Sequence, residues 1–332
     1  MESAYAPIHI ALAADSNYMV PLTVALKSIA GHHAPASVHI YLLFIEGHLA
    51  SSDLIRISDF AEAHRLGFTP LEVSADRLSI FPDSRHGKST LLRLFLPEML
   101  PALDKILYLD GDIVVTDNLQ ELFNTPLDAY YVAAARDSAT AYGLAYQTGL
   151  GIADTHWYFN AGVTLLNLQA LRDIGLPERV ADFATRYYDR IKAPDQDALN
   201  YVCQHGKTRY IHPRYNMNYS LEKDIARKIW GAEQIKEACA RPAIIHYIGP
   251  VKPWSVLSVH PRRKEWWKVV RLTHYAGYAC KDATPVNKLR KMFLLVAKPI
   301  EAQFSLETKQ RIGKLIPSFV KKRIKKSLLK SS

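Results

Sequence analysis

The chain has 332 residues, 48% of them hydrophobic, and a formal net charge of +10. This length and composition suffice for one large domain or two smaller ones, and they exclude a fibrous or largely disordered protein. The three cysteines, Cys203, Cys239 and Cys280, are too few and too scattered for a disulfide framework or a zinc cluster. This cysteine usage makes a reducing cytoplasm the simplest interpretation, and no signal peptide or membrane-spanning segment is visible in the sequence.

Strand-like and helical patterns alternate along the first third of the chain. The predicted strands cover residues 8–15, 38–46 and 69–73, and a fourth starts at residue 105. The predicted helices between them cover residues 18–33, 51–67 and 89–103. Alternation of this kind predicts an α/β fold with a Rossmann-like, mostly parallel sheet and helices on both faces.

The rest of the chain is less regular. We predict strands at residues 130–138 and 157–168 and within 241–254, and helices at residues 177–191 and 194–206. After about residue 260 the pattern changes to basic helices, at residues 286–300 and 307–330. Residues 261–332 carry 19 Lys or Arg and 4 Asp or Glu, whereas residues 1–260 carry 23 and 28. These differences predict a main domain over residues 1–260 and a basic helical extension over residues 261–332.

Two aspartates stand at the end of the fourth predicted strand, in the stretch KILYLDGDIVV of residues 105–115. Residues i and i+2 of an extended segment point to the same side, so Asp110 and Asp112 can grip one cation. Mg²⁺ and Mn²⁺ prefer oxygen ligands, and Mn²⁺ also accepts an imidazole. In a surface turn the same pair would simply be solvated, but the apolar residues on both sides favour a metal site. Ligands bind beyond the carboxyl ends of parallel strands, so Asp15, which ends the first strand, should face the same crevice.

His246 lies in a second candidate segment, IIHYIGPVKPW, which covers residues 244–254. A lone His in an apolar strand is more often a core residue than a metal ligand. Here a loop rich in Gly and Pro follows, which is typical of a segment that folds over an anion. Lys252 in that loop would supply the point charge for a phosphate.

Six stretches of the sequence together resemble one family. AADSNY, RHGKSTLLRL, YLDGDIVV, YFNAGVTLLNL, DQDALN and HYIGPVKPW occur in the order found in glycosyltransferase family 8, between residues 8 and 254. They look most like the bacterial lipopolysaccharide α-galactosyl- and α-glucosyltransferases. The resemblance implies a GT-A fold and a hexosyltransferase that uses UDP-galactose or UDP-glucose and retains the anomeric configuration. It also implies dependence on Mn²⁺, with Mg²⁺ as the other candidate.

The resemblance further implies roles for individual residues. The metal would be ligated by Asp110, Asp112 and His246. The nucleotide and its diphosphate would be held by Asp15, Asn17, Tyr18, Gly111, Gly249 and Lys252. The donor sugar would be surrounded by Arg93, Asp137, Asn160, Asp195 and Gln196.

Three of the donor-sugar residues are candidate catalytic groups. Gln196 would offer its carbonyl oxygen to the β face of the sugar, and Asp137 or Asp195 would give stronger electrostatic help or form a covalent bond. Retention can follow from double displacement or from same-face attack, and we favour same-face attack. Plain structural roles are the alternatives: Asn160 in a turn, Asp195 as a helix cap and Arg93 on a helix surface.

Two other functions stay open at this point. A metal-dependent phosphohydrolase would use the Asp-x-Asp pair as nucleophile and acid/base, although enzymes of the haloacid dehalogenase type place that motif on their first strand. A non-catalytic adaptor would use only the basic extension to bind a membrane. In that case the aspartate pair and His246 would be a coincidence.

The basic extension ends in KKRIKKSLLK, residues 321–330, which interleaves basic and apolar residues as membrane-surface helices do. A nucleic-acid tail is the rival interpretation, and a solvated charged terminus is the simplest one. An enzyme that extends a lipid-linked glycan meets its glycolipid or oligosaccharide acceptor at the membrane. We therefore expect peripheral attachment to the anionic inner face of the cell membrane and no nucleic-acid partner.

Overall fold

The computed structural model describes residues 7–81, 88–137, 143–222 and 224–303. The chain divides into two compact units, residues 1–246 and 247–332, which are described separately below. The predicted boundary at residue 260, which rests on charge and on the change to basic helices, stays a prediction.

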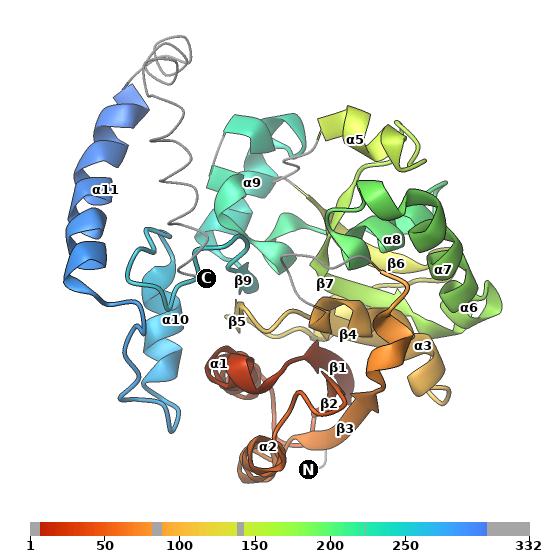
Figure 1. The fold of residues 1–332 in the computed structure, drawn as a ribbon, viewed down its shortest axis with the longest axis horizontal. Helices are drawn as coiled ribbons and strands as arrows, with labels where there is room; N and C mark the ends of the chain where they lie inside the picture. The colour runs from red at the N-terminus through yellow and green to blue at the C-terminus, as the bar shows by residue number, and fades with distance from the viewer. Residues whose placement is uncertain (1–6, 82–87, 138–142, 223, 304–332) are drawn as a thin grey trace. The chain divides into compact units, whose positions relative to one another are not determined.

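A seven-stranded sheet with the order β3-β2-β1-β4-β7-β6-β8 forms the centre of the first unit (Figure 1). Its strands are β1 (Ile8–Ala13), β2 (Val38–Ile45), β3 (Gly67–Val73), β4 (Lys105–Leu109), β6 (Val132–Arg136), β7 (Phe159–Asn167) and β8 (Thr208–Tyr210). Strands β1 to β4 pair in parallel, as do β6 and β8, whereas β7 runs antiparallel to both β4 and β6. The predicted mostly parallel sheet is confirmed.

Helices flank this sheet. They are α1 (Met19–Ala30), α2 (Ser51–Ala63), α3 (Leu96–Met99), α4 (Gln120–Phe123), α5 (Gly143–Gly149), α6 (Leu168–Asp173), α7 (Leu176–Tyr187), α8 (Pro194–Val202) and α9 (Ala232–Ala240). The helix predicted over residues 89–103 is instead a 3₁₀ helix, Ser89–Phe95, followed by the single turn of α3. Residues 91–96 of this segment are all buried, so the segment lacks the one-sided apolar pattern of a surface α-helix.

A second, two-stranded sheet joins β5 (Ile113–Val115) to β9 (Ile244–His246). The strands are antiparallel, and their register sets Ile113 opposite His246. The stretch predicted as one strand therefore belongs to two sheets: Asp110 follows β4, and Asp112 precedes β5. The two aspartates lie at the bend between the sheets.

The second unit contains α10 (Arg263–Val270) and α11 (Pro285–Gln303). Trp266 of α10 is fully buried and packs against Trp254 and Trp267. Helix α11 confirms the basic helix predicted at residues 286–300, whereas the helix predicted at 307–330, with KKRIKKSLLK, lies outside the described residues. Within the described ranges, no helix has both the length and the apolar character needed to span a bilayer.

Candidate metal and donor-sugar site

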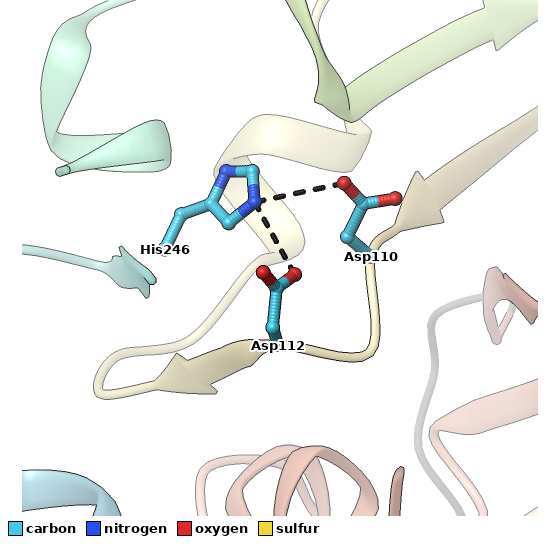
Figure 2. A group of neighbouring side chains, drawn as sticks. All are labelled: Asp110, Asp112 and His246. Atoms are coloured by element: carbon cyan, nitrogen blue, oxygen red, sulfur yellow. Dashed lines mark ion pairs between the residues drawn. The ribbon is translucent and has the colours of Figure 1, made fainter. Parts of the chain in front are cut away.

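Three predicted metal ligands come together at the bend between β4 and β5 (Figure 2). The Nε2 atom of His246 lies 3.3 Å from Asp112 Oδ1 and 3.6 Å from Asp110 Oδ2. One ligand atom from each residue lies within 4.8 Å of the others. The pairing of β5 with β9 explains this approach, because it sets His246 beside the residue that follows Asp112. Two carboxylates and one imidazole are a donor set that fits Mn²⁺.

Gly162 on β7 gives these side chains the space they occupy. A Cβ atom on this residue would lie 2.2 Å from His246 Cε1 and 2.5 Å from Asp110 Oδ2. The Gly162 carbonyl also accepts a hydrogen bond of 2.8 Å from the Asp110 backbone N–H. The sequence analysis missed the role of Gly162. The available signal was a glycine inside an apolar strand, because such a glycine often marks a place where other groups approach the backbone closely.

We expect Gly162→Ala to weaken Mn²⁺ binding by about 10-fold or more, because the added methyl group displaces His246 and Asp110. Overpacking of this kind also costs about 1–3 kcal/mol of stability. Gly149→Ala is the matched control, since a Cβ atom there meets nothing within 4 Å. Mn²⁺ titration followed by electron paramagnetic resonance, with thermal unfolding alongside, measures both effects. Unchanged Mn²⁺ binding in a folded Gly162→Ala protein would contradict the expectation.

Arg93 is a buried cation beside the metal cluster, by which we mean the three candidate ligands Asp110, Asp112 and His246. Its side chain is only 1% exposed. Its guanidinium donates to Asp110 Oδ1 at 2.7 Å, and its Nε lies 3.1 Å from Asp195 Oδ2. It also donates to the backbone carbonyls of Thr90 and Ala161. Burial alone would lower the pKa of Arg93, but the two carboxylates outweigh it and raise that pKa. The alternative that Arg93 lies on a helix surface is wrong.

Two tyrosines line the same region. The Tyr108 ring lies under the Arg93 guanidinium, 4.0 Å from ring centroid to Cζ. The Tyr18 ring lies against Gly111, where a Cβ atom would be 3.0 Å from the ring carbons. Burial, followed by the negative charges of Asp112 and Asp110, raises the pKa of Tyr18. The glycine between the two aspartates thus lets the backbone approach the Tyr18 ring.

Several residues predicted to surround the donor sugar form a hydrogen-bonded group next to Asp110 and His246. Asn160 Nδ2 donates to Gln196 Oε1 at 3.3 Å, and Gln196 Nε2 donates to Asp137 Oδ2 at 3.1 Å. Gln196 Oε1 also accepts from the Ala161 backbone N–H at 3.0 Å. A carbonyl oxygen has two lone pairs, so direct contact between this oxygen and a sugar requires one of these bonds to open or to be shared.

Helix α8 supplies two further carboxylates with different surroundings. Asp195 lies in its first turn and pairs with Arg93, while the N-cap residue is Ala193, so the cap role considered for Asp195 is wrong. Asp197 is fully buried and accepts hydrogen bonds from the hydroxyls of Tyr146 and Tyr158, at 2.6 and 2.5 Å. Asp197 also accepts hydrogen bonds from the backbone N–H groups of Lys192 and Ala193, at 3.1 and 3.0 Å, and so stabilises the start of α8. The sequence did not reveal this role.

The hydrogen bonds of the remaining predicted residues go to other parts of the chain. Asp15 ends β1 and accepts a hydrogen bond from the Asn17 backbone N–H at 2.8 Å, and Asn17 itself is exposed. The parallel pairing of β1 with β4 brings Asp15 to the same edge of the sheet as Asp110. Gly249 and Lys252 belong to the second unit, where Lys252 Nζ donates to the Tyr247 carbonyl at 3.0 Å. Their contacts with a nucleotide stay predictions.

Comparison with known proteins gives consistent matches. The sequence matches the model of glycosyl transferase family 8 over residues 9–257. It is 30% identical over 258 residues to the glycosyltransferase GlyA of Streptococcus pneumoniae, covering 78% of this chain and 34% of GlyA. The chain thus spans about one third of that relative's length. It is 24% identical over 292 residues to the lipopolysaccharide 1,2-glucosyltransferase of Escherichia coli, covering 86% of this chain and 84% of that enzyme.

The structure itself resembles that of the galactosyltransferase LgtC in complex with donor and acceptor sugar analogues. The TM-score is 0.72 at 26% identity, and the match covers 80% of this chain and 96% of LgtC. This likeness confirms the predicted GT-A fold. The family model spans the aspartate pair, the donor-sugar group and His246. The chain belongs to glycosyltransferase family 8.

Proposed function

We propose that this protein transfers galactose or glucose from a UDP-sugar to a lipopolysaccharide, a lipooligosaccharide or another surface glycan, with Mn²⁺ as cofactor and retention of the anomeric configuration. The observation that carries the proposal is the cluster of Asp110, Asp112 and His246 within the segment that matches the family. The acceptor class is supported by relatives named lipopolysaccharide 1,2-glucosyltransferase, from Escherichia coli, and lipopolysaccharide 1,3-galactosyltransferase, from Salmonella typhimurium.

In this proposal, Asp110, Asp112 and His246 hold the cation. A bound divalent cation supplies Lewis acidity that stabilises the negative charge of a diphosphate leaving group. Lys252 adds a second positive charge to that diphosphate from the loop that contains Gly249. The nucleotide itself is bound by Asp15, Asn17, Tyr18 and Gly111.

The donor-sugar group then orients the reacting carbon. Arg93 holds Asp195 by their 3.1 Å ion pair, and Gln196 holds Asp137 by a 3.1 Å hydrogen bond. Negative charge from these carboxylates stabilises the oxocarbenium character that develops as the sugar–phosphate bond breaks. We favour same-face attack, in which the acceptor hydroxyl passes its proton to the departing phosphate.

A panel of UDP-sugars incubated with Mn²⁺ tests the proposal, because many transferases slowly hydrolyse their own donor. We expect UDP to be released from UDP-galactose or UDP-glucose, and this release to stop when a chelator removes the metal. Release of phosphate from simple phosphate esters would instead identify a phosphohydrolase. If no UDP is released from any donor and calorimetry detects no binding of UDP with Mn²⁺, the proposal fails.

We further propose that the second unit attaches the enzyme to the inner face of the cell membrane. Helix α11 exposes Val286, Leu289, Met292 and Leu295, which are 54–68% exposed. Lys288, Arg290 and Lys291 lie among these apolar residues in the sequence. Apolar side chains flanked by basic ones are typical of helices that lie in the membrane interface.

For this attachment we expect the double variant Leu289→Asp and Met292→Asp to reduce co-sedimentation with anionic vesicles by about 10-fold or more, since each buried Leu or Met contributes about 1.5–3 kcal/mol. Leu272→Asp is the control, because Leu272 is 67% exposed but lies outside α11. Zwitterionic vesicles should bind the unaltered protein more weakly, by about 1 kcal/mol per basic residue near the surface. Equal binding of all three proteins would refute the attachment.

A further inference from the structure

Asn216 lies between the metal cluster and the donor-sugar group. It ends the 3₁₀ helix Pro213–Asn216 and is 2% exposed. Its Oδ1 lies 2.8 Å from His246 Nδ1, and its Nδ2 donates to Asn160 Oδ1 at 2.9 Å. One buried side chain thus contacts both halves of the site.

Backbone groups fix which way each amide points. The Gly162 backbone N–H donates to Asn160 at 3.0 Å, so the Asn160 atom that it meets must be an oxygen. The Asn216 atom that faces this oxygen at 2.9 Å must then be the NH₂ nitrogen. It follows that the other end of the Asn216 amide, which faces His246, is its oxygen.

This orientation decides where the hydrogen of the neutral His246 ring lies. An amide oxygen only accepts, so Nδ1 of His246 carries the hydrogen and donates it to Asn216. Nε2 is then left with its lone pair, and it is the atom that lies 3.3 Å from Asp112 and 3.6 Å from Asp110. A histidine that ligates a metal is commonly held in this way, through a hydrogen bond at its other ring nitrogen.

The same chain of hydrogen bonds continues from Asn160 to Gln196 and Asp137. Asn160 donates to Gln196 Oε1, whose identity as oxygen is fixed by the Ala161 backbone N–H at 3.0 Å. Gln196 therefore presents its NH₂ group to Asp137, at 3.1 Å. Each hydrogen bond in the series from His246 to Asp137 thus has a defined donor and a defined acceptor.

We propose that Asn216 is a positioning residue that fixes the ring of His246 for the cation and links the metal cluster, through Asn160, to Gln196 and Asp137. The inference deepens the proposed function and rests on it. The side-chain hydrogen bonds of Asn216 go to His246 and Asn160, and it acts on the reaction through these two residues.

Two substitutions separate the two contacts of Asn216. Asn216→Leu removes both, and we expect it to raise the Kd for Mn²⁺, measured with UDP present, by about 10–100-fold. Asn216→Asp keeps an oxygen for His246 but loses the NH₂ group that donates to Asn160. We expect its Mn²⁺ Kd to stay within about threefold of the unaltered protein, while hydrolysis of the donor at saturating Mn²⁺ falls by about 10-fold or more.

Asn167→Leu is the matched control. Asn167 is a half-buried asparagine at the opposite end of β7, where it caps α6 and donates to the Tyr130 carbonyl. Asn167→Leu should lower the thermal unfolding temperature. It should change neither the Kd for Mn²⁺ nor the rate of donor hydrolysis at saturating Mn²⁺. A merely structural role for Asn216 would give this same result.

The outcomes distinguish the inference from the function on which it rests. If the unaltered protein binds no Mn²⁺ in the presence of UDP, the proposed function fails. If it binds Mn²⁺ and a folded Asn216→Leu protein binds equally well, the positioning role is overturned. If the Asn216→Leu protein does not fold, Asn216→Asp decides alone. Unchanged donor hydrolysis in Asn216→Asp, or a Kd for Mn²⁺ raised by more than about threefold, overturns the inference.

Discussion

Asp112→Asn is expected to lower Mn²⁺-dependent release of UDP from the donor by at least about 10²–10³-fold. The substitution keeps the shape of the side chain and one oxygen but removes the negative charge that faces His246 at 3.3 Å. Asp112 is a cleaner choice than Asp110, which also pairs with the buried Arg93. Excess Mn²⁺ should restore part of the activity, because the asparagine oxygen can still act as a neutral ligand.

Asp117→Asn provides the control for this measurement. Asp117 follows β5, its side chain is 50% exposed, and it pairs with Arg214 at 2.5 Å. A surface ion pair of this kind contributes about 0–1 kcal/mol, so we expect activity within about twofold of the unaltered protein. Initial rates of UDP release at several Mn²⁺ concentrations compare the two variants. If the Asp112→Asn protein releases UDP at a rate within tenfold of the unaltered protein at low Mn²⁺, Asp112 is not a metal ligand.

Arg93→Met should have the largest effect on stability, a loss of about 3–5 kcal/mol in the free energy of unfolding. Methionine approximates the length of the arginine stem, but it leaves the carboxylates of Asp110 and Asp195 without their shared cation. Removing one partner of a buried ion pair is costly because the other charge stays buried without compensation. Urea unfolding of the metal-free protein measures the loss directly.

Arg77 offers a closely matched control. Its guanidinium also lies over an aromatic ring, that of Phe95 at 4.3 Å, and it also pairs with a carboxylate, that of Glu98. The difference is exposure, since the Arg77 side chain is 41% exposed and the Arg93 side chain 1% exposed. Arg77→Met should therefore cost only about 0–1 kcal/mol. Similar losses for the two variants would mean that the buried pair contributes no more than the exposed one.

The sequence predicted the parts of the fold that follow from local pattern. The apolar runs that became β1, β2 and β4, and the two aspartates after β4, could be read directly from the chain. The antiparallel direction of β7 could not, because an apolar strand has the same alternation in either direction. The 3₁₀ helix that contains Arg93 was also misread, since the carboxylates that hold this arginine inside are remote in the sequence.

In the candidate site, too, some residues could be predicted from the sequence and others could not. Asp110 and Asp112 could be named from the chemistry of paired carboxylates, whereas the ligand role of His246 followed from the resemblance to the family. Gly162 and Asn216 could not, because a glycine or an asparagine becomes informative only when its neighbours are known. Gly162 matters because any larger residue there would place a Cβ atom against His246. Asn216 matters because its oxygen meets an imidazole 30 residues further along the chain.

The pairing of β5 with β9 also sets the order in which the site can be completed during protein synthesis. Arg93 and the two aspartates emerge early, and Arg93 precedes both of its partners, Asp110 and Asp195, in the chain. His246, the last residue of the first unit, follows Asp112 by 134 positions. At about 5–20 residues per second, the ribosome adds it roughly 10 s later. A nascent chain therefore carries two residues of the candidate metal site before it carries the third, and the set is complete only when the whole first unit has been synthesised.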